Sequence, residues 1–358
     1  MTDLEIYDLA LNVLTSLTTD INDGLYSELE GVITLSWGTT NEINAWAESK
    51  SLPMSPPEHN ITLQYKLVLQ IYRDIENYML YMRNGLDDKI YDHWFKGVNY
   101  HHGMINVFGD NECITNIFIA AITWVYFHEL GHLIQEHGYI RSLYDNVESM
   151  TINECEVVGQ AIPEGKTADI FHVTEIAADF FATNMCLYEL IRHFKGNELE
   201  VAIQFLSCGL SCVIYRFHGC KSFKQDVTPI GTHPNPLIRL EIVIPIIHEV
   251  MDMKEVRDYS KIEIDRAYLV NIGCWSSTTV GMFWIRSNPE VDRMPDDFFI
   301  AGSLNRPGMK EYLNVIISTW DEIESKVIQF QRFDDNFRRL KFSDQFRNEV
   351  FKIAPEEI

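Results

Sequence analysis

Two histidines and a glutamate in the segment His-Glu-Leu-Gly-His, residues 128–132, have the types and spacing of a zinc site. On a helix, His128 and His132 would lie one turn apart on the same face, so both imidazoles could reach one tetrahedral metal ion. Glu129 would lie beside that face, where its carboxylate could take a proton from a metal-bound water. The motif alone is weak, because scrambled chains of this composition would contain it roughly three times in a hundred. Its value depends on a supporting helix, a third ligand and groups that orient the ligands.

The segment 113–137 is predicted to be the helix that carries the motif. It contains no proline, and its apolar part of about 15 residues is shorter than the ~20 that a membrane span needs, so we expect a buried core helix. Gly138 would stop this helix and place His137 in its last turn. Gly131 lies on the ligand side, where a missing side chain would let another element approach closely.

A second predicted helix, from residue 174 to about 195, supplies a candidate third ligand. Glu175 and Asp179 are four residues apart and are flanked by Ala and Phe rather than by Lys or Arg. Carboxylates on such a helix are costly to bury unless positive charge compensates them, which makes the alternative of a solvated acidic face unattractive. We therefore expect Glu175 to bind the metal and Asp179 to accept a hydrogen bond from a ligand imidazole.

A proline-rich turn at residues 232–239, Thr-His-Pro-Asn-Pro-Leu-Ile-Arg, completes the set. The two prolines restrict the backbone and fix where His233 points. His233 could donate to the oxyanion that develops when water attacks a peptide carbonyl, and Arg239 could pair with the carboxylates of the second helix. Taken alone, a His-Pro turn is more often only a turn.

The three segments in this order, H-E-x-x-H, E-x-x-A-D-x-x-A and H-P-x-x-x-x-R, resemble the gluzincin metallopeptidases of the HtpX and CAAX-prenyl-protease type, most of which are membrane-embedded. The likeness is closer to the soluble phage-exclusion peptidases of the Lit type. Those share an I-F-x-x-A-I-x-W helix, seen here at 117–124, and the T-H-P-x-x-x-x-R element. The resemblance implies a zinc endopeptidase with His128, His132 and Glu175 as ligands and Glu129 as catalytic base. It also implies a role in phage exclusion and a protein substrate, which is a translation factor for the Lit type, although nothing in the zinc motif encodes that substrate.

Composition narrows the setting and the partners. The 358 residues carry a net charge of −23, which argues against nucleic acid or an anionic membrane as a partner because phosphate contacts need clustered Lys and Arg. The first ten residues contain three acids and no basic residue, unlike a signal peptide. Seven cysteines without a C-x-x-C pair fit reduced thiols, so we expect a cytoplasmic protein.

The expected fold is α+β and predominantly helical: a zincin-like core with a small sheet and two zinc-site helices. Strands are predicted at 30–37 and 59–65, and further helices at 3–18, 68–83 and 311–333. We expect a metallopeptidase domain at residues 1–254 and a mainly helical C-terminal appendage at 255–358, which could select substrates or serve as a stabilising cap.

Two other classes of protein stay open at this point. One is a metal-binding regulatory module, in which a HELGH helix also precedes a Glu-bearing helix; such modules usually lack the His-Pro-x4-Arg element that is present here. The other is a catalytically silent scaffold whose C-terminal region binds a partner. Of the three classes, only the zinc-dependent peptidase accounts for all three segments, so it remains our expectation.

Overall fold

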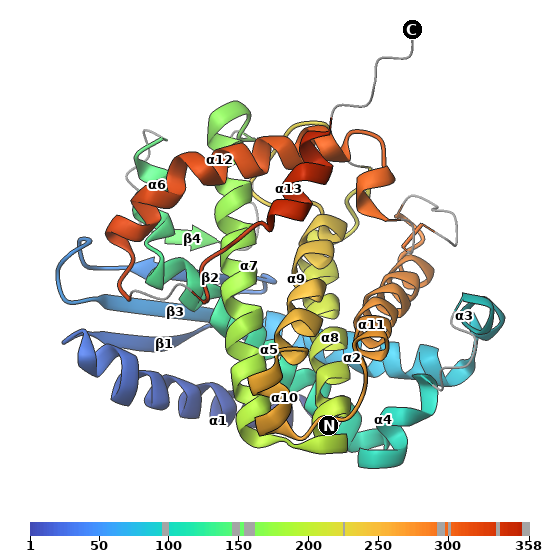
Figure 1. Ribbon diagram of the computed structural model, residues 1–358. Helices are drawn as coiled ribbons and strands as arrows, with labels where there is room; N and C mark the ends of the chain where they lie inside the picture. Colours follow the sequence, from blue (N-terminus) through green and yellow to red (C-terminus); the bar gives the residue numbers. More distant parts are fainter. Residues whose placement is uncertain are drawn as a thin grey trace, which may run out of the picture.

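The computed structural model describes residues 1–94, 100–144, 151–153, 162–224, 226–291, 298–299, 302–333 and 337–352. These residues are mostly helical with one four-stranded mixed sheet, which confirms the predicted fold class (Figure 1). The helices are α1 (Asp3–Ile21), α2 (Tyr65–Asn84), α3 (Asp88–Trp94), α4 (Tyr100–Phe108), α5 (Asp110–Ile134), α6 (His137–Ser142), α7 (Gly165–His193), α8 (Gly196–His218), α9 (Pro236–Met251), α10 (Lys254–Ser260), α11 (Arg266–Ser287), α12 (Met309–Phe330) and α13 (Asp344–Phe351), with a π-helical turn η1 (Asn22–Tyr26) and a 3-10 turn η2 (Ser303–Asn305).

The sheet lies at one side of the helices, in the order β1 (Val32–Gly38), β3 (Glu58–Gln64), β2 (Ala45–Ser49) and β4 (Thr151–Asn153). β1 runs parallel to β3, whereas β2 is antiparallel to both of its neighbours. β1 and β3 confirm the two predicted strands. β2 and β4 were not predicted, because the former is a five-residue strand with two alanines and the latter has only three residues.

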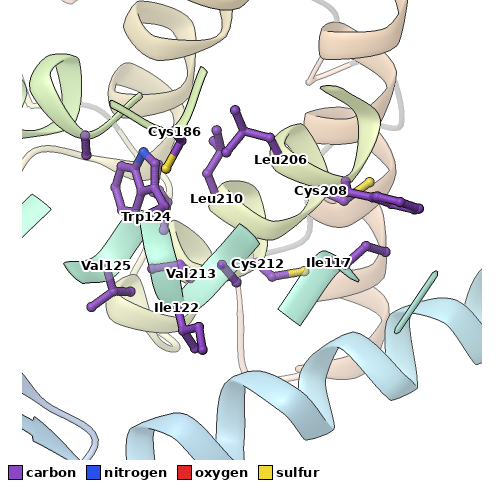
Figure 2. Packing of buried hydrophobic residues seen from close by; sticks show 14 of the residues in the cluster. Ile117, Ile122, Trp124, Val125, Cys186, Leu206, Cys208, Leu210, Cys212 and Val213 are labelled. Carbon is purple, nitrogen blue, oxygen red and sulfur yellow. The ribbon is translucent and has the colours of Figure 1, made fainter. Parts of the chain in front are cut away.

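The zinc-motif helix α5 lies at the centre of the fold, between α2, α7 and α8. Every residue from 121 to 134 is buried, as expected for a helix that is apolar on all sides. α8 crosses it at Gly209, where a Cβ atom would lie 2.8 Å from the carbonyl oxygen of Ile117 and 3.0 Å from the amide nitrogen of Ala121. Figure 2 shows the side chains of both helices around this crossing.

Two of the described helices, α5 and α8, are long and apolar enough to cross a membrane by length and composition alone. In the structure, 83% and 89% of their most apolar windows are buried. Both windows therefore supply the hydrophobic core of this fold, as was expected for α5.

The zinc-motif helix ends earlier than predicted. α5 stops at Ile134, Glu136 adopts a left-handed backbone (φ 53°, ψ 37°), and α6 begins at His137. Gly138 lies inside α6, so the prediction that it stops α5 with His137 in the last turn is wrong. The Glu136 carboxylate pairs with Arg332, whose amide donates to the carbonyl of Ile134 at 2.8 Å. These contacts hold a non-glycine residue in a conformation that it rarely adopts.

The second predicted helix is present as α7 and is longer at its start, since it begins at Gly165 rather than at residue 174. It packs closely along α5 at Gly131. A Cβ atom at that position would lie 3.1 Å from Phe181 Cδ1 and 3.3 Å from Ala178 Cα, which confirms that the missing side chain permits a close approach.

The helices after residue 254 pack directly on the helices before it. α11 lies against α8 and α9, and α12 lies across α7 near its N-terminal end (Figure 1). Buried side chains of α12, including Ile316 and Trp320, form a second hydrophobic cluster with Ile170, Val173 and Ile176 of α7. The boundary between residues 254 and 255 stays a prediction.

Candidate metal centre

The packing of α7 on α5 brings the side chains of His128, His132 and Glu175 together. Their ligand atoms all lie within 4.8 Å of one another, and the three residues are at most 1% exposed. The two Nε2 atoms are 3.0 Å apart. The carboxylate places Oε2 at 3.3 Å from His128 Nε2 and Oε1 at 3.4 Å from His132 Nε2. Two histidines on α5 with a distal glutamate on α7 are a zincin-like arrangement.

This geometry fits a small cation. Ligand atoms at about 2.0–2.1 Å from a tetrahedral zinc ion are separated by roughly 3.3 Å. The two Nε2 atoms are 3.0 Å apart, and each lies 3.3 or 3.4 Å from one of the two carboxylate oxygens of Glu175. The Oε2 atom of Glu175 is buried and accepts no hydrogen bond from the described residues. A buried carboxylate oxygen in that position calls for a positive partner. The group can therefore hold a metal ion, and its nitrogen and oxygen donors suit zinc.

With the Glu175 ligand included, the site contains three carboxylates and two guanidinium groups. Arg239 makes a bidentate pair with Asp179, with Nε at 2.8 Å from Oδ2 and Nη2 at 2.7 Å from Oδ1. Arg141 donates from Nη2 to Glu175 Oε1 at 2.6 Å. Glu129, the third carboxylate, follows the first ligand on α5 and is completely buried. With the imidazoles neutral, one carboxylate is in excess, which favours a bound cation.

Asp179 also orients a ligand imidazole. Its Oδ1 atom lies 2.8 Å from His128 Nδ1, and a carboxylate this close favours the ring proton on Nδ1 and leaves the Nε2 lone pair for the ligand group. Trp124 packs one turn before, with its ring centroid 5.4 Å from that of His128 and its Nε1 donating to Thr183 Oγ1 at 3.0 Å. The guanidinium of Arg239 lies 5.9 Å from the Trp124 ring. The tryptophan of the apolar motif therefore supports two residues of the site.

His132 contacts a histidine that the sequence did not single out. The Nδ1 atoms of His132 and His137 are 2.9 Å apart. Because His132 directs Nε2 at the ligand group, its Nδ1 carries the proton and donates to His137. Burial and then the neighbouring His132 hold the pKa of His137 well below its usual range, which suits a neutral acceptor. The turn at Glu136 carries His137 back to α5, so this contact has no counterpart in the spacing of the sequence.

The protonation states also suit metal binding. Burial lowers the pKa of His132 to about 4, which keeps its imidazole neutral. Burial alone would raise the pKa of the Glu175 carboxyl, but the imidazoles of His233, His132 and His128 outweigh burial and hold that pKa well below its usual range. Neutral imidazoles and an ionised carboxylate are the forms that coordinate zinc.

His233 reaches the same site from the proline-rich turn. Its Nε2 atom lies 3.4 Å from Glu175 Oε2, and its Nδ1 atom lies 2.7 Å from Thr232 Oγ1. His233 and Arg239 also line a cavity of about 650 Å³, together with the end of α8, the turn before α9, His172 and Tyr312. The structure thus brings all seven residues singled out in the sequence to one region, and it adds His137 and Arg141. His137 and Arg141 follow the zinc motif within ten residues, and no spacing in the sequence marks either of them as part of the site.

No family model, curated protein or solved structure matches the chain. The likeness to gluzincin peptidases therefore rests on the residues of this site, in particular on the buried group of His128, His132 and Glu175.

Proposed function

We propose that this protein is a zinc-dependent endopeptidase whose metal is held by His128, His132 and Glu175. The observation that carries the proposal is this buried group, with Glu129 directly after its first histidine. A structural zinc site is closed by protein ligands, whereas a catalytic site keeps one position for a reactant. The cavity of about 650 Å³ is lined by His233 and by none of the three ligands, and its room for a substrate next to His233 supports the catalytic alternative.

Zinc, when bound, supplies a Lewis acid that lowers the pKa of water at the site and polarises a substrate carbonyl. Glu129 is the general base that accepts the proton of the attacking water and later delivers it to the leaving amine. Asp179, His137 and Arg141 hold the ligand side chains in place, so that little reorganisation is needed during the reaction.

His233 is the proposed donor to the oxyanion. If the Thr232 hydroxyl donates to Nδ1, the ring proton sits on Nε2, which faces the ligand group at 3.4 Å from Glu175 Oε2. An N–H fixed at this place can stabilise the negative charge that develops on the carbonyl oxygen of the substrate.

The proposed substrate is a protein in the cytoplasm. A net charge of −23 supports the absence of nucleic acid and anionic membranes as partners. The resemblance to Lit-type peptidases supports a role in phage exclusion, with a translation factor as the first substrate to examine.

The test compares new protein N-termini in cells that express the wild type or the Glu129→Gln variant. The substitution keeps the size of the side chain and removes the base, so we expect stoichiometric zinc in both proteins and cleavage products only with the wild type. Full cleavage by Glu129→Gln contradicts the proposal. A zinc-loaded wild type that produces no new N-termini favours a metal-binding scaffold or regulatory module.

A further inference from the structure

His172 connects helix α12 to the turn that carries His233. It lies on α7 three residues before Glu175, with Nε2 at 3.1 Å from the carbonyl oxygen of Ile230 and Nδ1 at 2.7 Å from the hydroxyl of Tyr312. A carbonyl oxygen only accepts, so Nε2 carries the proton and donates to Ile230. The neutral ring then accepts the hydroxyl proton of Tyr312 at Nδ1.

Both rings of this link are buried. His172 is 3% exposed and Tyr312 is 1% exposed, with ring centroids 5.9 Å apart. Burial lowers the pKa of His172 to about 3, which agrees with the neutral ring that the hydrogen bonds require. A buried donor or acceptor that loses its partner is costly, so the pair adds a directional contact to the hydrophobic packing of α12 on α7.

The backbone at Ile230 lies three residues before His233, in the short segment 230–233 that positions the His233 side chain. It forms an isolated antiparallel bridge with Glu164, and Gly231 donates its amide to the carbonyl of Pro163 at 2.9 Å. The Ile230 side chain is 45% exposed, so packing of that side chain contributes little to its position. Hydrogen bonds to the backbone hold the segment instead: one comes from the Gly231 amide, and another comes from the His172 side chain on α7.

The residues of this link line the same cavity as His233. His172, Ile230, His233 and Tyr312 all line the cavity of about 650 Å³. Tyr312 comes from α12, which lies in the C-terminal region that shows no chemical motif in the sequence.

We propose that Tyr312 and His172 are positioning residues that set His233 against the ligand group, which makes α12 part of the catalytic apparatus. The inference rests on the proposed function of His233, but the physical link can be tested without activity.

Hydrogen exchange of the zinc-loaded full-length protein tests the link. Tyr312→Phe removes one hydroxyl, and we expect amides in residues 228–233 to exchange about threefold faster or more, with α5 unchanged. His172→Leu breaks the same link from α7 and should give the same local change. The matched control is Tyr78→Phe, which removes a buried hydroxyl bonded to Thr279 Oγ1 at 2.8 Å and should leave 228–233 unchanged. Wild-type exchange at 228–233 in both test variants overturns the proposal.

Cleavage kinetics test the consequence, with the protein identified by the N-terminus comparison as substrate. We expect Tyr312→Phe to lower kcat about tenfold, with KM and zinc content unchanged, and to cost nothing further in the His233→Ala background. Equal losses in both backgrounds overturn the coupling to His233. A wild type that cleaves nothing overturns the proposed function instead, and the exchange result still decides whether the link exists.

Discussion

The Nδ1 atoms of His132 and His137 lie 2.9 Å apart although the two residues belong to different helices. The contact exists because the chain turns at Glu136, whose left-handed backbone ends α5 and lets α6 begin. Such a conformation costs on the order of 1 kcal/mol for a residue other than glycine, and the ion pair with Arg332 offsets that cost. The turn therefore places a second imidazole directly behind a proposed zinc ligand.

Replacing His137 with alanine is expected to weaken zinc binding by about 10- to 100-fold, because the ligand His132 loses the acceptor that orients its ring. Competition with a chelating dye at fixed pH measures the dissociation constant. His193→Ala is the control, since that imidazole is exposed on α7, with 61% of its side chain accessible. An unchanged zinc affinity for His137→Ala would show that the contact does not support the ligand.

The Arg141→Met variant is expected to behave differently with and without zinc. In the presence of a chelator, the free energy of unfolding should fall by about 3–5 kcal/mol, because the buried Glu175 carboxylate loses its guanidinium partner. At saturating zinc the loss should be much smaller, because the cation compensates the same carboxylate. Urea unfolding measures both values.

The control for Arg141 is Arg347→Met, which breaks a more exposed ion pair with Asp321 and should cost at most about 1 kcal/mol in either condition. Equal losses for Arg141→Met with and without zinc would contradict a shared role of arginine and metal at Glu175.

Gly209→Ala is expected to destabilise the protein by about 1–3 kcal/mol, although alanine favours helices by about 1 kcal/mol. The new Cβ would meet backbone atoms of Ile117 and Ala121, which cannot move without separating α8 from α5. Urea unfolding at neutral pH measures the change. Gly24→Ala is the control, since no atom lies within 4 Å of its Cβ position. A Gly209→Ala protein as stable as the wild type would show that the helices do not cross this closely.

His59 is expected to make the fold sensitive to acid. Its ring is 2% exposed, with Nδ1 at 2.6 Å from the hydroxyl of Tyr26 and Nε2 at 3.9 Å from Glu136 Oε1. Burial, and then the charge of Arg332, lower its pKa to about 3. The folded protein therefore keeps His59 neutral while the unfolded chain protonates it below about pH 6.5, so stability falls as pH falls from about 6.5 toward 3.

This one residue should account for about 2 kcal/mol of the stability lost between pH 7 and pH 5. Urea unfolding of His59→Gln at both pH values should show a difference smaller by that amount, whereas His193→Ala should keep the wild-type difference. The same acid sensitivity in His59→Gln as in the wild type would contradict the neutral state of the buried ring.

The proposed ligands could be found in the sequence because their signal is local. His128 and His132 share a helical face by spacing alone, and Glu175 with Asp179 is anomalous on an apolar helix. The close approach of another element at Gly131 could also be predicted locally, because the spacing to His128 and His132 places this glycine on the ligand face of the helix.

The rest depends on contacts between residues far apart in the chain. Nothing around Glu136 predicts a left-handed turn, because its partner Arg332 follows 196 residues later. Helix α12 was predicted by its periodicity, yet its place beside the site depends on long-range packing against α7 and on contacts such as the bond between Tyr312 and His172, which are 140 residues apart. Local propensity and spacing carry no information on such pairs.

The central claim is that His128, His132 and Glu175 bind zinc, and anomalous X-ray scattering measured on both sides of the zinc absorption edge tests it most directly. The account predicts a single zinc peak in crystals of the purified protein, bonded at about 2.0–2.2 Å to the Nε2 atoms of both histidines and to the carboxylate. Zinc-supplemented crystals with no peak between these three side chains, or with the zinc held by other residues, would contradict it.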